Sequence, residues 1–239
     1  MLALALAGAG LLALPGTATP AGQIVIRGAE SGSHLRLAVN GSHFVVNGYM
    51  SASEPTGCRF TRPRTTANCP LDNVDSILIE MGPSGDKVEI EDPMPVPVTA
   101  YLGKGSDKFI GNSEPDTCYP QGSRRNRCYG GAGNDICITG PRNSDCVGDG
   151  GDDYCRHGTG SDGCWGDFSP APDDPRGGTP GDDICVMGPG KDGCHGGAGN
   201  DRLYEGSGQG KLYGQGGHDF CDGGSGVGRS YTCEFGPRH

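Results

Sequence analysis

The chain has 239 residues, among them 46 Gly, 18 Pro and 12 Cys, and its formal net charge is −10. Hydrophobic residues make up 33% and aromatic residues 6%, which excludes an ordinary globular core of this length, because too little apolar surface is available to offset the loss of chain entropy. The acidic balance argues against nucleic acid and anionic membranes as partners, and favours cations.

Residues 1–21 have the pattern of a secretory signal peptide. An apolar run rich in Ala and Leu is followed by small residues that offer cleavage points. The run is too short to cross a bilayer, so we expect no membrane span after signal removal. A membrane anchor or a buried helix is the alternative interpretation. Twelve cysteines, an even number, fit an oxidising destination and predict a secreted, extracellular protein.

Residues 22–101 are predicted to form a β-rich N-terminal cap that passes into the opening coils of a solenoid. Short β-branched runs separated by Gly, Asn and Pro indicate strands joined by tight turns, at residues 24–26, 35–39, 44–46 and 77–79. Met81–Glu89 resembles a degenerate nonapeptide, with Asp86 and Val88 in its two diagnostic positions. A solenoid needs such a cap, since an open end exposes unpaired strand edges and core.

Residues 102–231 consist of nonapeptides laid end to end, of which Gly130–Ile138 reads G-G-A-G-N-D-I-C-I. Position six is Asp in nine of the thirteen units, and position eight is Cys in nine. The units start at Leu102, Gly111, Gln121, Gly130, Thr139, Gly148, His157, Gly178, Met187, Gly196, Glu205, Gly214 and Gly223. So strict a period predicts an all-β fold, a parallel β-roll or β-solenoid.

Two segments do not follow the repeat. A Pro- and Asp-rich insert at residues 166–177 is predicted to be a surface loop, and residues 232–239 are a C-terminal tail. We expect the insert to leave the alternation of the units intact.

Each nonapeptide divides into a six-residue turn and a three-residue strand, and two units make one coil. Turns eighteen residues apart therefore stack on the same edge, about 4.8 Å apart. Stacked Asp carboxylates and turn carbonyls can offer six or more oxygen atoms, the ligand set that Ca²⁺ accepts and Mg²⁺ does not. A single Asp in such a turn would be interpreted as a solvent-exposed turn residue. Nine Asp residues at the same position of the repeat indicate calcium binding.

The two edges differ in their acidic residues. The first edge carries Asp116, Asp135, Asp153, Asp183, Asp201 and Asp219, and we expect calcium to be bound mainly along it. The second edge carries Asp107, Asn126, Ser144, Asp162, Asp192, Gly210 and Gly228. On this second edge only Asp162 and Asp192 are expected to form a complete pair of stacked carboxylates for a calcium ion.

Position eight points inward, so cysteines form two columns in the core. Register partners on adjacent parallel strands lie within disulfide range, whereas sheets about 10 Å apart are too distant to be bridged without distortion. The predicted pairs are Cys118–Cys137, Cys155–Cys185, Cys128–Cys146, Cys164–Cys194, Cys221–Cys233 and Cys58–Cys69. The shifted pairing, Cys137–Cys155 with Cys146–Cys164, is equally permitted by spacing. Buried unpaired cysteines are a further alternative, and a zinc site is disfavoured because no Cys-x-x-Cys occurs.

Most of the chain resembles the RTX (hemolysin-type) calcium-binding nonapeptide repeat family, and Gly196–Tyr204, G-G-A-G-N-D-R-L-Y, matches the motif at every position. The resemblance implies a parallel β-roll whose turns bind calcium and which orders as the metal binds. The layout is similar to that of small secreted bacterial calcium-binding β-roll proteins. Cysteine in the core position departs from the family pattern, which raises the question of whether calcium drives folding here.

The expected function is that of a secreted calcium-binding module, structural or adhesive, and not an enzyme. No His-Glu-x-x-His or Gly-x-Ser-x-Gly motif occurs. A secreted hydrolase or another solenoid enzyme with an unidentified site is the alternative, while the ordered Thr ladder of an ice-binding surface is absent. Position nine is expected to face outward, and on one face it forms a row of aromatic and apolar residues. This row predicts either a surface for a glycan or protein partner or simply the preference of such residues for strands. Its members are Ile110, Tyr129, Val147, Trp165, His195 and Tyr213.

Overall fold

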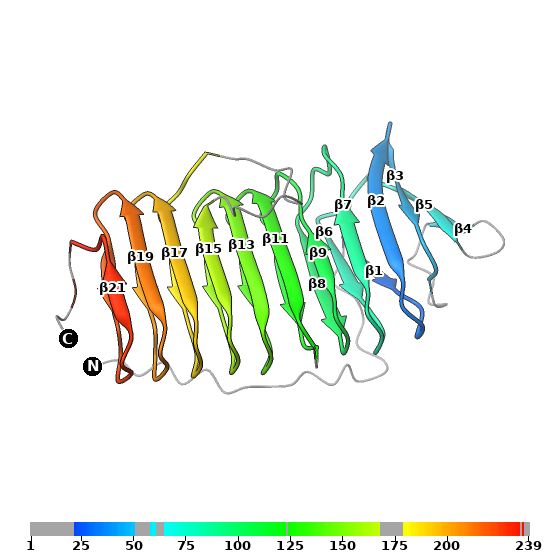
Figure 1. The fold of residues 1–239 in the computed structure, drawn as a ribbon. Helices are drawn as coiled ribbons and strands as arrows, with labels where there is room; N and C mark the ends of the chain where they lie inside the picture. The colour runs from blue at the N-terminus through cyan, green and yellow to red at the C-terminus, as the bar shows by residue number, and fades with distance from the viewer. Residues whose placement is uncertain are drawn as a thin grey trace.

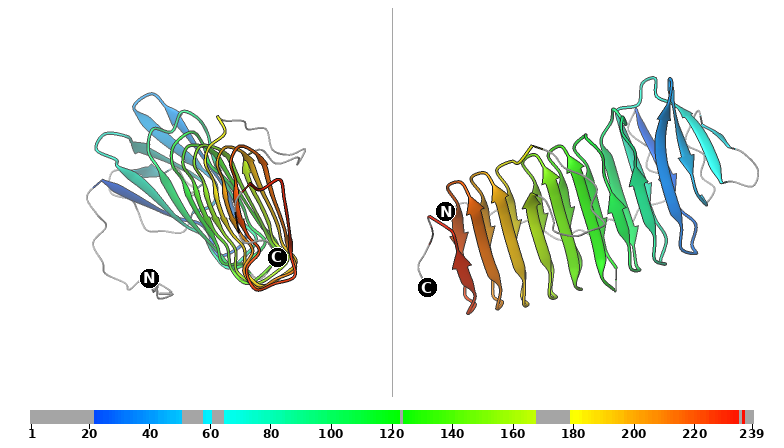
Figure 2. Two further views of the ribbon diagram at one scale, coloured as in Figure 1. Left: turned by 90° about the vertical axis from the view of Figure 1, so that its left-hand side faces the viewer. Right: turned by 45° about the horizontal axis from the view of Figure 1, so that its top comes forward.

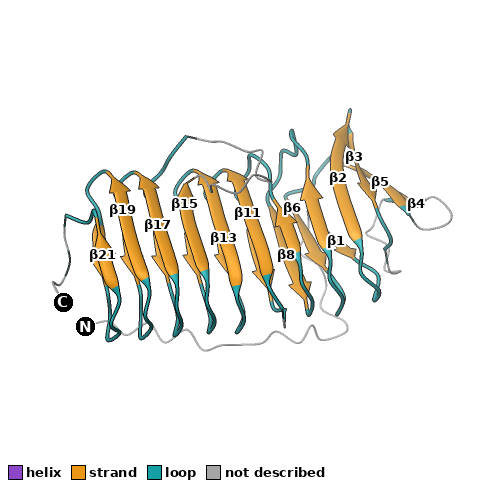
Figure 3. Ribbon diagram, in the orientation of Figure 1, coloured by secondary structure: helices purple, strands orange, loops and turns teal. Residues whose placement is uncertain are grey.

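The computed structural model describes residues 22–50, 58–60, 65–122, 124–167, 179–234 and 236. Within these residues the chain is all-β, a parallel β-solenoid of about eight coils without a helix (Figures 1 and 3). Each coil contributes one strand to each of two sheets. The predicted fold class is confirmed. The predicted signal peptide, residues 1–21, lies outside the described residues.

The two sheets run the length of the molecule. The nine-stranded sheet contains, in spatial order, β1 (Gln23–Arg27), β6 (Ser76–Glu80), β8 (Val98–Gly103), β10 (Thr117–Pro120), β12 (Ile136–Ile138), β14 (Tyr154–Arg156), β16 (Ile184–Val186), β18 (Arg202–Tyr204) and β20 (Phe220–Asp222). The twelve-stranded sheet contains β21 (Arg229–Tyr231), β19 (Lys211–Gly216), β17 (Gly193–Ala198), β15 (Gly163–Asp167), β13 (Ser144–Gly150), β11 (Asn126–Ala132), β9 (Lys108–Ile110), β7 (Lys87–Ile90), β2 (His34–Asn40), β3 (His43–Asn47), β5 (Thr66–Pro70) and β4 (Arg59–Phe60).

The N-terminal cap continues the solenoid and then closes it. Strands β1 and β2 pair in parallel with β6 and β7, as the coils do. Beyond β2 the sheet continues with β3, β5 and β4, each antiparallel to the strand before it, at the blue and cyan end of Figure 1. This hairpin layer covers the edge of β2 that would otherwise be unpaired, which is a common protection of solenoid ends. All four predicted runs lie within strands, in β1, β2, β3 and β6.

The insert leaves the register of the coils intact. In the strand ladder, Cys155 of β14 lies in register with Cys185 of β16, thirty residues later. Cys137 lies in register with Cys155, eighteen residues later, in the same way. Gly166 and Asp167 lie in β15, so the insert begins two residues later than predicted. Residues 168–178 lie outside the described residues.

The core changes in character along the axis. At the N-terminal end it consists of large apolar side chains such as Phe44, Leu35 and Ile79, all fully buried. From β10 onward the inward position is mostly cysteine, with Leu203 and Leu212 in the later coils. The coils narrow in the same direction, as the view along the axis shows (Figure 2). Smaller inward side chains let the two sheets approach each other.

The disulfides bridge the two sheets, which corrects the predicted pairing within each sheet. The structure contains Cys118–Cys128, Cys137–Cys146 and Cys185–Cys194, with Cα–Cα distances of 6.3, 6.3 and 6.6 Å. Cys155 and Cys164 are buried and unbonded. The predicted pairs Cys118–Cys137, Cys128–Cys146, Cys155–Cys185 and Cys164–Cys194 are wrong, whereas Cys58–Cys69 and Cys221–Cys233 are confirmed.

Two physical reasons explain this correction. Register partners on parallel strands, such as Cys118 and Cys137, project side by side in the same direction. Strands on opposite sheets turn their Cβ atoms toward each other. The roll is also thinner than two ordinary stacked sheets, because a core of cysteines does not hold the sheets about 10 Å apart.

Candidate metal centre

The Asp side chains of the first edge form one continuous buried column, the first acidic column. Each lies in a turn that leads from the twelve-stranded to the nine-stranded sheet. The backbone N–H of one Asp donates to Oδ1 of the Asp in the next coil, at 2.7 Å from Asp116 to Asp135 and 2.8 Å from Asp153 to Asp183. The column consists of Asp116, Asp135, Asp153, Asp183, Asp201 and Asp219, each no more than 6% exposed.

The turns of the opposite edge hold a second acidic column. Asp86, Asp107, Asn126, Ser144, Asp162 and Asp192 are its members. The N–H of Asp86 donates to Asp107 Oδ1 at 2.9 Å, and that of Asp162 donates to Asp192 Oδ1 at 2.9 Å. Asn126 and Ser144 interrupt the acidic residues in the middle. The nine predicted ligands thus lie on two edges, as the spacing predicted, and Asp86 extends the second column toward the cap.

The second carboxylate oxygen of these residues, Oδ2, is buried and differs from Oδ1 in its hydrogen bonding. Oδ2 has no hydrogen-bond partner among the described residues in several members of both columns, namely Asp86, Asp107, Asp153, Asp162, Asp183, Asp192 and Asp201. Buried polar atoms in folded proteins are nearly always paired, so a row of such oxygens calls for an explanation.

Along the first acidic column, a glycine beside each Asp makes room for that oxygen. A Cβ atom on Gly148 would collide with Asp153 Oδ2 and with the carbonyl oxygen of Gly166 in the next coil. A Cβ on Gly166 would meet Asp183 Oδ2 and the carbonyl oxygen of Gly196 in the same way. The first glycine is therefore required for space, while Gly151 and its equivalents adopt a positive φ, of 111° at Gly151. Carboxylate and carbonyl oxygens converge above each of these first glycines.

Burial without neutralisation raises the pKa values of these carboxyl groups. Burial raises the pKa of Asp153 to about 9, and the like charges of Asp135, Asp149 and Asp167 add to the effect. Burial likewise raises the pKa of Asp183 to about 9, and that of Asp201 to about 7. In the second column burial raises the pKa of Asp107 to about 7 and that of Asp162 to about 6. Such shifts indicate carboxylates that lack a positive partner.

Two further carboxylates, Asp149 and Asp167, join the first acidic column. They pair in register on β13 and β15, and both are buried. Asp149 has a φ of 79°, at the register position that Gly131 occupies in β11. Asp167 Oδ2 accepts a hydrogen bond of 2.5 Å from the N–H of Ala198. Sequence reasoning missed this pair, although Asp in the second position of a unit, where Gly is usual, was the available signal.

Glu205 was also missed, and it serves the second edge. It is fully buried, and its Oε1 accepts a hydrogen bond from the N–H of Gly210. A Cβ on Gly228 would collide with its carboxylate. Its charge contributes to the raised pKa of Asp192, of which burial is the larger cause. Glu205 therefore supplies a carboxylate where the glycines at positions 210 and 228 leave the turns without one.

Comparison with protein-family models, with curated proteins and with solved structures finds no match.

The chemistry of both columns suits a hard cation. All the donors are oxygen atoms, they are anionic or carbonyl, and they are stacked at the coil spacing, so one ion could contact two turns. A tolerant cation with six to eight oxygen ligands fits this set better than an ion that demands an octahedron of water and protein oxygens. The zinc alternative does not fit here, because neither column contains a Cys or His ligand.

The predicted outward row lies on the twelve-stranded sheet, in register from Ile110 to Tyr213. Its later rings stack face to face along the axis. Ring centroids are 5.9 Å apart for Trp165 and His195, 4.6 Å for His195 and Tyr213, and 4.9 Å for Tyr213 and Tyr231. Since the ring faces cover one another, this aromatic column (Trp165, His195, Tyr213, Tyr231) presents mainly ring edges outward.

Proposed function

We propose that this protein is a secreted calcium-binding β-roll protein, a structural or adhesive module, in which Ca²⁺ ions lie between the stacked turns of the two acidic columns. The observation that carries the proposal is the row of buried Oδ2 atoms without hydrogen-bond partners among the described residues. A bound cation would satisfy such oxygens and would also offset the repulsion between carboxylates that adjoin along a column.

In the proposed site, the two carboxylate oxygens, the glycines and the turn carbonyls have different roles in binding the ion. Oδ1 of Asp183 fixes the preceding turn by accepting the N–H of Asp153, which leaves Oδ2 free to bind a cation. Along the first acidic column a glycine, such as Gly166 beside Asp183, admits this oxygen to the interior, and the carbonyl of the next coil is directed to the same place. When bound, Ca²⁺ would supply the positive charge that these groups share.

The first acidic column between β11 and β18 is the strongest binding region. It contains the uninterrupted run of turn aspartates, and Asp149 and Asp167 add two more carboxylates beside Asp153. Affinity of oxygen sites for Ca²⁺ rises with the number of charged ligands. On the second edge, Asn126 and Ser144 separate an N-terminal pair, Asp86 and Asp107, from a C-terminal group.

Secretion is part of the proposal. Five disulfides in the described part of the chain are compatible with an oxidising, extracellular destination. The same residues contain no helix of the length and apolarity that a membrane crossing requires. A cell-surface glycan or protein remains a candidate partner, for which the aromatic column is the available surface. Its neighbours Ile110, Tyr129 and Val147 are buried in a cluster of their own, so that part of the predicted outward row is not exposed.

Calcium titration tests the function directly. Oxidised protein is titrated with Ca²⁺ by calorimetry, and thermal unfolding is followed with Ca²⁺, with Mg²⁺ and with a chelator. We expect several ions per chain and a rise in Tm with Ca²⁺ but not with Mg²⁺, since binding at 100 times Kd stabilises the folded state by about 2.7 kcal/mol per site. Oxidised, folded protein that takes up no calcium at millimolar concentration would refute the proposal.

A further inference from the structure

Two unbonded cysteines lie beside a disulfide in the core, at the coils that flank the insert. Cys155 and Cys164 face each other from β14 and β15, and both are at most 3% exposed. In the next coil Cys185 and Cys194 occupy the same positions on β16 and β17 and are bonded. Cys155 is the register partner of Cys185, and Cys164 is that of Cys194. The four cysteines thus occupy the corners of a small rectangle, the sulfur cluster.

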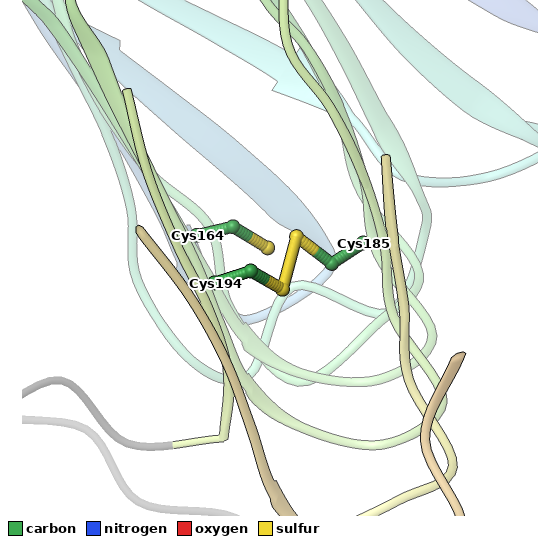
Figure 4. A group of neighbouring side chains, drawn as sticks. All are labelled: Cys164, Cys185 and Cys194. Carbon is green, nitrogen blue, oxygen red and sulfur yellow. A yellow bond between two sulfur atoms is a disulfide. The ribbon is translucent and has the colours of Figure 1, made fainter. Parts of the chain in front are cut away.

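The sulfur atoms of this cluster are close enough to share one ion. Sγ of Cys164, Cys185 and Cys194 all lie within 4.8 Å of one another, and Figure 4 shows Cys164 directed at the bond between the other two. Cys155 makes a side-chain hydrogen bond with Cys164. Sulfur ligands at 2.3 Å from a tetrahedral zinc ion are about 3.8 Å apart, so only small movements separate this arrangement from a four-sulfur site.

Other cysteines of the roll do not form such a cluster. In the two preceding coils both cysteine pairs, Cys118–Cys128 and Cys137–Cys146, are closed as disulfides. In the sulfur cluster half of the sulfur atoms remain thiols. A further soft atom adjoins it, because Met187 Sδ lies 3.4 Å from Cys185 Sγ.

We propose that Cys155, Cys164, Cys185 and Cys194 form a redox-gated site for one soft divalent cation of the zinc and cadmium class, separate from the oxygen sites of the acidic columns. A reductant opens Cys185–Cys194: the S–S bond breaks, two thiols form, and the reductant is oxidised, a thiol to its own disulfide or a phosphine, with water, to its oxide. The cation then forms four metal–sulfur bonds and displaces four thiol protons to solvent. Soft thiolate sulfur selects such ions over Ca²⁺, which prefers oxygen.

The location of the cluster makes an ion a better ligand than a larger partner. All four cysteines are at most 3% exposed, so a protein or a bulky electrophile cannot reach the sulfur atoms without unfolding the roll. A bare metal ion needs only brief separation of neighbouring coils. Closing the site would tie β14 and β15 to β16 and β17 across the insert, whereas each core disulfide joins only the two strands of one coil.

Cadmium titration tests the site, because cadmium–thiolate bonds give an ultraviolet charge-transfer absorption. Full-length protein in millimolar calcium is reduced with a phosphine, freed of oxygen and titrated with Cd²⁺, while circular dichroism monitors the sheet. We expect one Cd²⁺ per chain with thiolate absorption. The double variant Cys155→Ser with Cys164→Ser should lose this ion. The matched variant Cys137→Ser with Cys146→Ser should keep it, since in the reduced protein it removes two other core thiols and spares the cluster.

Several results would overturn the site. They are equal cadmium uptake in the wild type and the Cys155→Ser/Cys164→Ser variant, absence of the thiolate absorption in folded reduced protein, or loss of the sheet on reduction. Should the double serine variant fail to fold, Cys164→Ala decides, because three sulfur ligands give about three quarters of the absorption. Calcium uptake is measured by calorimetry on the same samples, so failure of the calcium sites is recognised separately.

Discussion

The turn aspartates each perform two tasks with two oxygens. Oδ1 accepts a backbone N–H from the preceding coil, and this bond alone explains why a carboxylate or amide recurs at the position. Asn126 fulfils that first task, since its Oδ1 accepts the N–H of Asp107 at 2.9 Å. The second oxygen is what distinguishes Asp from Asn here, because only a carboxylate brings a buried charge that needs a cation.

Substitution of Asp183 by Asn separates the two tasks. The amide keeps the Oδ1 acceptor for Asp153 but removes one charge from the first acidic column. In calcium-free protein above pH 9, where Asp183 is ionised, we expect the Tm to be unchanged or higher, because repulsion falls. In calcium we expect a lower Tm and the loss of at least one ion, measured by scanning and titration calorimetry.

Ser144→Ala is the matched control for Asp183→Asn. Ser144 offers the second acidic column only its N–H, to Asp162 at 2.7 Å, and its hydroxyl bonds locally to the Arg142 carbonyl. Calcium stoichiometry should be unaffected. Equal effects of the two substitutions on calcium binding would contradict the assignment of Asp183 as a ligand.

Glycines in the strands are not equivalent, and Gly148→Ala should be severe. The added methyl group meets Asp153 Oδ2 and the Gly166 carbonyl, neither of which can move without breaking the column. We expect a destabilisation of about 1–3 kcal/mol or more, as for other overpacked sites. Gly193→Ala places its methyl group where no atom lies within 4 Å, and should change stability by less than about 1 kcal/mol. Chemical denaturation of both variants measures the difference, and similar losses would be contrary to this view.

At the scale of single elements, the sequence predicts positions better than partners. The period of nine predicted which cysteines share a column, and the register confirms both columns. The same period could not predict the bonded pairs, because pairing depends on how closely the sheets approach. That approach is set by the small volume of the cysteine core, which is known only once the whole roll is assembled.

Carboxylates outside the sixth position of the nonapeptide show a second limit of what the repeat pattern can predict. Asp167 and Glu205 reach the edges from positions that the repeat assigns to strand or corner. Whether a side chain there turns outward or into a column depends on space left by glycines in the neighbouring coils, such as Gly197 and Gly228. Those contacts join residues more than twenty positions apart and are not visible in one unit.

The aromatic column stabilises the C-terminal coils through stacking along the outer face. Trp165→Ala removes the ring that stacks on His195 and lies over Gly163. Each aromatic pair contributes about 0.5–1.5 kcal/mol beyond its buried area. We therefore expect a lower Tm with unchanged calcium stoichiometry, measured by scanning and titration calorimetry. A Tm equal to that of the wild type, with weakened binding to cell-wall glycan, would instead indicate a partner surface.

On the scale of the whole molecule, the buried carboxylates predict an inverted pH dependence. Their folded pKa values, about 9 for Asp153 and Asp183, lie above the ordinary value of 3.8. A raised carboxyl pKa means that the folded state binds the proton more tightly than the unfolded state does. The stabilisation is therefore complete below pH 3.8 and is lost as the pH rises toward 9.

Calcium should reverse this trend. Without calcium we expect Tm to fall between pH 5 and pH 9, while with saturating calcium the decline disappears because the ion replaces the protons. Calcium affinity should increase over the same range. Thermal scans across pH and calorimetry in buffers of different ionisation enthalpy check both statements, and a calcium-free Tm that rises with pH would contradict them.

The uninterrupted pairing on either side of the insert has a consequence for how such a chain can grow. Neighbouring coils are joined by the same ladder of backbone hydrogen bonds whether the connecting segment is short or long, since Cys155 is in register with Cys185 as Cys137 is with Cys155.

 The corner after Asp167 therefore accepts additional polypeptide without a change in pitch or in the alignment of either acidic column. This corner is a natural entry point for a foreign peptide or a whole guest domain, displayed from a scaffold whose acidic columns remain continuous beneath it.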